Sequence, residues 1–320
     1  MITNYLWAII GPLITLSASY VYKPSMLDCA HTSHLVYHEQ QDLNPLRKDH
    51  GLSAYHLVSD IHKQETGMRV CAFKLTGTNN IIVAYRGTDL NNSANLLIDL
   101  GIAASILDSS DANSYFVAEH AQSWLEKHAS GLLHFMNNHK EFVRYLPTNA
   151  ALTLLNYCGY DLETAKKYKR LGIAHAFAAF AQIKKENPGC TFYITGHSLG
   201  GFYAQMVAYH HGLTAYTFNA PGAYQTYRQL YPEWTRALWW IRSKKLITNY
   251  VREHDLVGTF GTHLGQIKII PNVQNGPKNN QILPGYNDTL WLIYDLTEYA
   301  RRNHSMAQVV EHLVSAKANH

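Results

Sequence analysis

Residues 191–208 read TFYITGHSLGGFYAQMVA, and this stretch decides the fold. Its first five residues are β-branched or aromatic, which is typical of a strand, and the run after Gly201 is typical of a helix. Between them, the pattern Gly196-x-Ser198-x-Gly200 fits a turn so tight that the serine is strained and exposes its hydroxyl. Side chains at positions 196 and 200 would clash with the neighbouring strand and helix. The stretch therefore predicts a strand–turn–helix unit with a reactive serine at the turn.

Strands and helices alternate on both sides of this unit. Apolar runs of strand length lie at 68–74, 80–86, 190–195, 213–218, 246–252 and 266–271. Helical spacing of apolar residues predicts helices over 115–146, 162–186 and 202–210, and from Ser305 towards the C-terminus. This alternation predicts an α/β fold with a mostly parallel central sheet and helices on both faces.

The composition excludes several classes of protein. The 320 residues are 47% hydrophobic and 16% charged, which excludes a disordered chain. The net charge is only +4, and no basic stripe is present, so we expect no nucleic-acid partner. The densest basic stretch, Lys166 to Arg170, is predicted to be a solvated helix face. No H-E-x-x-H or C-x-x-C pattern occurs, so we expect neither a metal nor another cofactor, and buried free thiols at Cys71 and Cys190.

The N-terminus allows two interpretations. Residues 5–18 form a mostly apolar run that is too short to span a bilayer but long enough for a signal peptide. Residues 2–4 carry no Lys or Arg, and Pro12 would break a helix, which favours a buried N-terminal segment instead. We therefore divide the chain into residues 1–30, a signal peptide or apolar segment, and a single domain over 31–320. We favour a secreted or membrane-associated location, with a cytoplasmic location as the alternative.

Four sequence elements, in order, resemble the class 3 lipase family. They are the strand end Val83-Ala-Tyr-Arg-Gly-Thr88, the turn Gly196–Gly201, the strand end Thr217-Phe-Asn-Ala-Pro-Gly222, and the stretch Val251-Arg-Glu-His-Asp-Leu-Val257. Asn219 stands where the family usually has Gly, and Arg252 where it usually has Asn. The resemblance covers about residues 80–260. It implies an α/β-hydrolase fold and a serine carboxylic ester hydrolase with Ser198 as the nucleophile.

A serine hydroxyl needs a general base, and the base needs a carboxylate that orients it. In this fold the acid and then the base follow the serine along the chain. Among the carboxylates after Ser198, only Asp255 follows a predicted strand and lies in a family-like element. We expect His304 to be the base because it precedes the last predicted helix, the position that the family uses. His263, eight residues after Asp255, is the alternative; His312 and His320 are less well placed.

The negative charge of an acyl-transfer intermediate needs two hydrogen-bond donors, the oxyanion hole. One is expected to be the backbone N–H of Leu199, at the start of the new helix. The family resemblance assigns the other to Thr88. The flanking Arg86 and Asp89 are expected to form an ion pair that holds the loop.

Two apolar segments could contact a lipid or belong to the core. Residues 90–110 are either a lid, as in the family, or a buried helix; the apolar side chains concerned are Leu96, Leu97, Ile98, Ile102, Ile106 and Leu107. The aromatic segment 231–241 is expected to pack in the core, with lipid contact as the alternative.

The sequence thus predicts a lipid acyl ester hydrolase, of the triacylglycerol lipase or phospholipase A type. A soluble esterase or acyltransferase with the same triad is one alternative, and a non-catalytic binding protein with a hydrolase fold is another. The expected partners are a lipid or other ester substrate and a membrane or lipid interface. The oligomeric state stays open.

Overall fold

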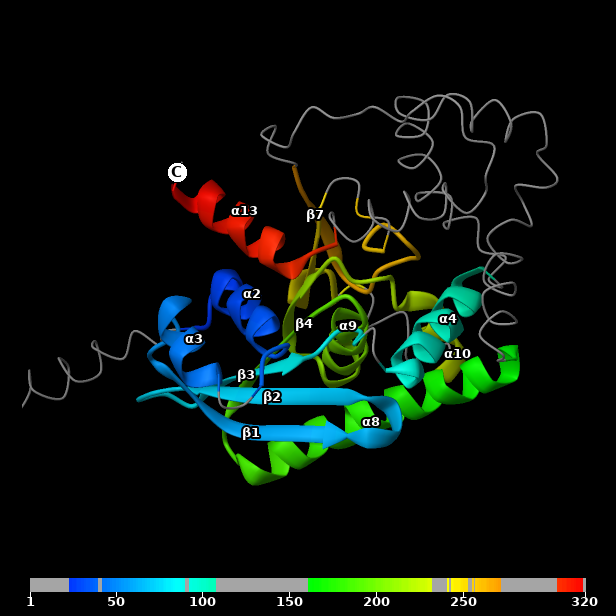
Figure 1. The fold of residues 1–320 in the computed structure, drawn as a ribbon, viewed down its shortest axis with the longest axis horizontal. Helices are drawn as coiled ribbons and strands as arrows, with labels where there is room; N and C mark the ends of the chain where they lie inside the picture. The colour runs from blue at the N-terminus through cyan, green and yellow to red at the C-terminus, as the bar shows by residue number, and fades with distance from the viewer. Residues whose placement is uncertain are drawn as a thin grey trace, which may run out of the picture.

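The computed structural model describes residues 23–39, 42–89, 92–107, 161–231, 241, 243–252, 255, 257–271 and 304–318 (Figure 1). The expectations for residues 5–18, for 108–146, for Cys158 and for most of the aromatic segment 231–241 therefore lie outside the described residues. Among the helices that these residues form, none combines the length and the apolar character needed to cross a bilayer.

The described strands form a seven-stranded sheet whose order follows the sequence. Its strands are β1 (Tyr55–Lys63), β2 (Met68–Leu75), β3 (Asn80–Tyr85), β4 (Thr191–His197), β5 (Thr214–Phe218), β6 (Ile247–Arg252) and β7 (Gln266–Ile270). The pairs β1–β2 and β2–β3 are antiparallel, and all pairs from β3 to β7 are parallel. The predicted α/β class and mostly parallel sheet are confirmed, with β1 as the strand that the sequence did not predict.

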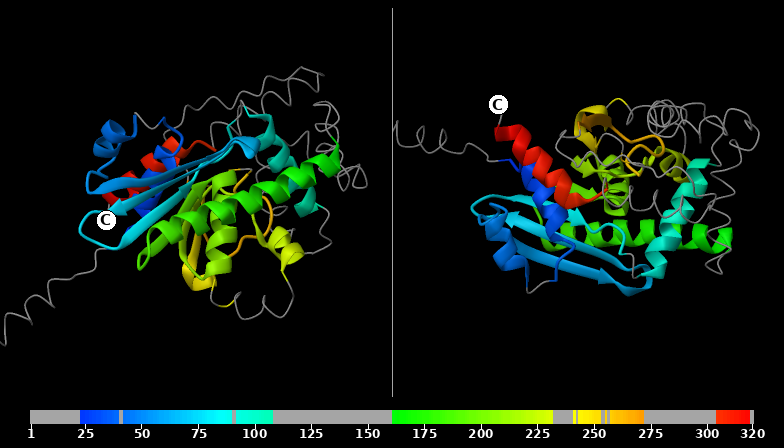
Figure 2. Two further views of the ribbon diagram at one scale, coloured as in Figure 1. Left: turned by 90° about the horizontal axis from the view of Figure 1, so that it is seen from below. Right: turned by 45° about the horizontal axis from the view of Figure 1, so that its top comes forward.

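The helices that connect the parallel strands lie on one face of the sheet. They are α4 (Ser93–Leu107), α8 (Leu162–Glu186), α9 (Leu199–His211) and α10 (Tyr224–Leu230). Crossovers between parallel strands are nearly always right-handed, so strands added in one direction place their connecting helices on the same side. Asp161 begins α8 by accepting a hydrogen bond from the backbone N–H of Thr164, and Ile173, Phe180 and Ile183 bury its apolar stripe against the sheet. Figure 2 shows α8 running along this face.

Helices from the two ends of the described chain cover the opposite face. They are α2 (Met26–Leu35), α3 (Leu43–Asp49) and α13 (Met306–Ala318). α2 and α13 lie side by side and contact each other (Figures 1 and 2). A capping box between Ser25 and Asp28 begins α2, and the buried Cys29 and Ala30 pack against the sheet. Residue 30, where we divided the chain, thus lies inside a helix of the core.

The predicted solvated helix face is wrong at Lys169, whereas Lys167 and Arg170 are exposed as expected. Within the basic stretch that begins at Lys166, Lys169 is only 5% exposed, because its side chain lies where α8 packs against α4 and near Gln229 of α10. Burial lowers the pKa of Lys169 to about 8, and the nearby Arg170 and Lys166 contribute. The expectation of buried free thiols holds in part. Cys71 is buried, Cys190 is half-buried, and neither forms a disulfide.

Candidate active site

Ser198 lies in a strained turn between β4 and α9. Its backbone angles are φ 56° and ψ −129°, in a region that non-glycine residues rarely adopt. A Cβ atom at Gly196 would come within 2.4 Å of the Gly200 carbonyl group. A Cβ atom at Gly200 would lie 2.1 Å from the carbonyl oxygen of Tyr85, at the end of β3. The predicted reason for both glycines is therefore confirmed, and the turn presents its serine at the N-terminus of α9.

Asn219, which stands where class 3 lipases usually have glycine, ends β5 in a conformation that suits asparagine. Asn219 has φ 46°, in the left-handed region that Gly and Asn adopt at the lowest cost. Its side-chain oxygen also accepts a hydrogen bond from the backbone N–H of Arg252, at 2.9 Å, which ties the end of β5 to the end of β6. Arg252 in turn donates to Gln308 of α13 at 2.6 Å. Asn219 and Arg252, the two residues that differ from the family pattern, thus link the ends of β5 and β6 to each other and to α13.

The structure brings Asp255 and His304 together. Asp255 follows β6 and is fully buried, and its Oδ2 lies 2.8 Å from Nδ1 of His304, which directly precedes α13. The other carboxylate oxygen of Asp255 accepts a hydrogen bond from the Gly258 N–H at 2.5 Å. The ring of His304 packs against the ring of His197, the neighbour of Ser198, with centroids 4.6 Å apart. Among the described residues, none forms a hydrogen bond with Nε2 of His304.

His263, the alternative base, contacts the loop that holds Asp255 instead. It is 4% exposed, and its Nε2 lies 2.8 Å from the carbonyl oxygen of Gly258, the residue whose N–H binds Asp255. A carbonyl only accepts, so Nε2 of His263 is the donor. Burial lowers the pKa of His263 to about 4, which keeps the ring neutral near pH 7. The structure thus places His263 in the loop that holds the carboxylate.

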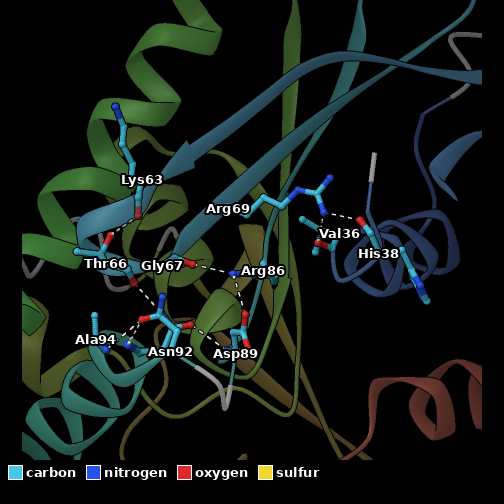
Figure 3. Close-up of polar contacts among 11 residues, drawn as sticks. Val36, His38, Lys63, Thr66, Gly67, Arg69, Arg86, Asp89, Asn92 and Ala94 are labelled. Carbon is cyan, nitrogen blue, oxygen red and sulfur yellow. Dashed lines mark hydrogen bonds and ion pairs between the residues drawn. The ribbon is translucent and has the colours of Figure 1, made fainter. Parts of the chain in front are cut away.

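Polar contacts hold the loop after β3, and its backbone lies close to the turn that carries Ser198. Nη2 of Arg86 donates to the carbonyl oxygen of Gly67 at 2.9 Å and lies 3.6 Å from Oδ2 of Asp89, so the expected ion pair is present (Figure 3). Gly87 comes so close that a Cβ atom there would lie 2.6 Å from the carbonyl oxygen of His197. Thr88 is therefore presented beside the turn that carries Ser198.

A half-buried carboxylate on α4 orients the Thr88 hydroxyl. Oγ1 of Thr88 donates to Oδ2 of Asp99 at 2.7 Å. Burial raises the pKa of Asp99 to about 7, although this hydrogen bond and the nearby His304 both lower it. Asp99 was not predicted as a site residue, because its sequence context is that of an ordinary polar residue in an apolar helix.

Because the pKa of Asp99 is raised, the free energy of unfolding should depend on pH through this carboxyl group. Between about pH 4 and pH 7 the carboxyl is protonated in the folded state and ionised in the unfolded state, so its contribution to the free energy of unfolding falls as the pH rises. Asp99→Asn keeps an acceptor for Thr88 but cannot ionise. We expect the variant to be more stable than the wild type at pH 8 and the difference to shrink towards pH 4, as measured by urea unfolding. A stability difference that grows as the pH falls would contradict this.

The described turns of α4 pack as a core helix. Leu97, Ile98 and Ile102 are at most 2% exposed, and α4 contacts both α8 and α10. Leu97 lies with Ala165 of α8, whereas Ile98 and Ile102 belong to the main core on that face of the sheet. The side chains of Leu96, Ile106 and Leu107 are not among those described. The buried-helix interpretation of this segment is thus the one that these contacts favour.

In the described part of the chain, no group of three or more His, Cys, Asp or Glu side chains could hold a metal ion. The candidate site brings together the strained Ser198 at the N-terminus of α9, the contact between Asp255 and His304, and the hydrogen bond from Thr88 to Asp99. Ser198, Thr88 and Asp255 follow the carboxyl ends of β4, β3 and β6. Ligands of parallel sheets bind at this edge.

The family model described as "Lipase (class 3)" matches residues 82–223. The resemblance to class 3 lipases is confirmed by this match, which runs from β3 through the nucleophile turn to the loop after β5. Among curated proteins, "Putative lipase ATG15" of Eremothecium gossypii is 40% identical over 62 residues, which are 19% of this chain and 11% of that protein. The aligned part thus spans about a tenth of the length of this relative.

Several solved fungal lipases are similar to the chain at low identity. Lipase II from Rhizopus niveus is 14% identical with a TM-score of 0.36, covering 75% of this chain and 78% of that one. A lipase from Rhizopus microsporus var. chinensis is 14% identical with a TM-score of 0.34, covering 73% and 67%. The N225Q mutant of MDLA from Penicillium cyclopium is 11% identical with a TM-score of 0.37, covering 78% of each chain.

Proposed function

We propose that this chain is a serine carboxylic ester hydrolase with Ser198 as nucleophile, His304 as base and Asp255 as the acid that orients the base. The observation that carries the proposal is the 2.8 Å contact between Asp255 and His304, made at the sheet edge where the strained turn presents Ser198. Three residues of these types at this edge, in this chain order, are the requirements for acyl transfer through a serine.

The reaction proceeds in two halves. The Ser198 hydroxyl attacks the acyl carbonyl carbon while Nε2 of His304 takes its proton, and Asp255 stabilises the imidazolium that forms. The resulting oxyanion accepts hydrogen bonds from the backbone N–H groups of Leu199 and Thr88, while the Thr88 hydroxyl donates to Asp99. His304 then protonates the leaving alcohol. In the second half, water attacks the acyl carbonyl of the acyl-enzyme while His304 takes its proton. His304 then returns the proton to the Ser198 oxygen, and the carboxylic acid is released.

The substrate class is proposed to be lipid acyl esters, either triacylglycerols or phospholipids at an acyl ester. The class 3 lipase match over residues 82–223 supports this choice. A soluble esterase or acyltransferase would use the same triad. A non-catalytic protein would need neither the strain at Ser198 nor a buried Asp255–His304 pair, and both are costly to keep.

A substrate panel tests this proposal. The wild type should react with a fluorophosphonate and hydrolyse triacylglycerol emulsions or phospholipid vesicles faster than dissolved short-chain p-nitrophenyl esters. Its rate should rise sharply when one triacylglycerol passes from dissolved to emulsified, because an apolar interface concentrates the substrate at the enzyme. Rates that follow the dissolved concentration smoothly would instead indicate a soluble esterase, and absence of labelling would indicate a binding protein.

A further inference from the structure

His197, the residue before Ser198, forms a hydrogen bond with each of its two ring nitrogens. Nε2 lies 2.6 Å from the backbone carbonyl oxygen of His304, and Nδ1 lies 2.8 Å from the hydroxyl of Tyr37. The ring is 5% exposed. A carbonyl only accepts, so Nε2 carries the proton. Burial lowers the pKa of His197 well below its usual range, and the adjacent His304 lowers it further, so the ring is neutral and Nδ1 accepts from Tyr37.

Tyr37 is held firmly in the position that this contact needs. Its hydroxyl accepts a hydrogen bond from the backbone N–H of Gly87, in the loop that carries Thr88. The carbonyl groups on either side of it, those of Val36 and His38, both accept from Nη1 of Arg69, as Figure 3 shows. Arg69 is 1% exposed and is itself fixed by Asp60 at 2.9 Å. The Tyr37 backbone is therefore tied to β2 by a buried arginine.

These contacts form one continuous chain of hydrogen bonds. It runs from the N–H of Gly87 to the Tyr37 hydroxyl, from that hydroxyl to Nδ1 of His197, and from Nε2–H of His197 to the carbonyl oxygen of His304. It connects the oxyanion loop, the segment after α2, the nucleophile strand and the segment before α13. These four segments are far apart in the sequence.

We infer that Tyr37 and His197 are positioning residues that fix the backbone of His304, and with it the base, relative to Ser198 and the oxyanion loop. The inference rests on the proposed function. Tyr37 selects the tautomer of His197, because a hydroxyl that donates to Nδ1 leaves the proton on Nε2. Only this tautomer donates to the carbonyl of His304. The Asp255 contact fixes the ring of His304 at Nδ1, and the His197 contact fixes its main chain.

The test compares two tyrosine-to-phenylalanine variants. Tyr37→Phe removes only the hydroxyl that sets the His197 tautomer. Tyr85→Phe is the matched control: its hydroxyl is buried too and donates to the carbonyl oxygen of Ala176 at 3.0 Å, outside this chain of hydrogen bonds. Misplacement of a reacting group by about 1 Å can cost about 100-fold in rate, so we expect Tyr37→Phe to lower kcat at least about tenfold with KM nearly unchanged. Tyr85→Phe should lower the melting temperature similarly and keep kcat.

Variants of His197 provide a second readout. His197→Gln keeps an N–H close to the position of Nε2 and should retain far more kcat than His197→Ala. Adding Tyr37→Phe to His197→Ala should cost nothing further, because the chain is already broken. Nitrogen-15 NMR of labelled histidine should show the Nε2–H tautomer of His197 in the wild type and a mixture of tautomers in Tyr37→Phe.

The outcomes separate this inference from the proposed function. Absence of fluorophosphonate labelling in the wild type would overturn both. A labelled wild type whose Tyr37→Phe variant keeps full kcat, or loses no more kcat than Tyr85→Phe, would overturn this inference alone. Fully additive losses in the Tyr37→Phe/His197→Ala double variant would overturn it as well.

Discussion

Ser198→Ala should abolish ester hydrolysis and leave no site for covalent labelling by a fluorophosphonate. Removing the nucleophile of a serine triad lowers kcat on the order of a million-fold, because the remaining members have nothing to activate. The variant should fold normally, since the Ser198 side chain makes no capping hydrogen bond to α9 and only one oxygen atom is lost. Single-turnover labelling and the ester panel measure the loss. Equal labelling of the variant and the wild type would refute the assignment of the nucleophile.

A second variant, Ser198→Gly, separates the effect of backbone strain on stability from the loss of the hydroxyl group. It lacks the same oxygen as Ser198→Ala but also removes the Cβ atom that makes φ 56° costly. Such backbone strain costs about 1–3 kcal/mol, and the entropy of glycine offsets about 0.5–1 kcal/mol of the gain. We expect the glycine variant to be equally inactive and to melt at a higher temperature than the alanine variant. A lower melting temperature would mean that the turn is not strained at this position.

The sequence predicted the elements whose signals are local. The turn around Ser198, the helix that ends at Asn187-Pro188-Gly189 and the parallel strands all carry their patterns in consecutive residues, and the structure has them within one to three residues. β1 was not predicted because Asp60 and its histidine neighbours interrupt the alternation of apolar residues. Asp60 binds the buried Arg69, and no local sequence pattern indicates this contact.

The contacts that surround the candidate site connect residues far apart in the chain, and the sequence did not predict them. Asp99 is eleven residues from Thr88, and Tyr37 is 160 residues from His197. A tyrosine after a short helix and a histidine inside the nucleophile motif have no distinctive spacing. The hydrogen bond between Tyr37 and His197 forms only when α2 packs on β4. That packing includes buried contacts such as the hydrogen bond between the hydroxyls of Ser33 and Thr195 at 2.7 Å. Tertiary packing, rather than propensity, therefore sets this part of the site.

The second large expected effect is the loss of activity on replacing His304, compared with the smaller loss on replacing His263. A general base must reach the nucleophile and its orienting acid at once. His304 meets Asp255 through Nδ1 and packs its ring against His197, the neighbour of Ser198, whereas His263 uses Nε2 to hold the carbonyl of Gly258. We expect His304→Ala to be as inactive as Ser198→Ala, and the double variant to be no worse than either single variant, because the triad acts as a unit.

His263→Ala should differ in kind from His304→Ala. It removes a buried ring that supports the loop carrying Gly258, so the free energy of unfolding should fall by about 2 kcal/mol or more. The Asp255–His304 contact does not pass through the ring of His263, so the folded variant should keep a kcat far above that of His304→Ala. Titrating active sites with a fluorophosphonate corrects each rate for the folded fraction. If His263→Ala remains folded and is nevertheless as inactive as His304→Ala, then His263 and not His304 is the base, and the contact of His304 with Asp255 is structural.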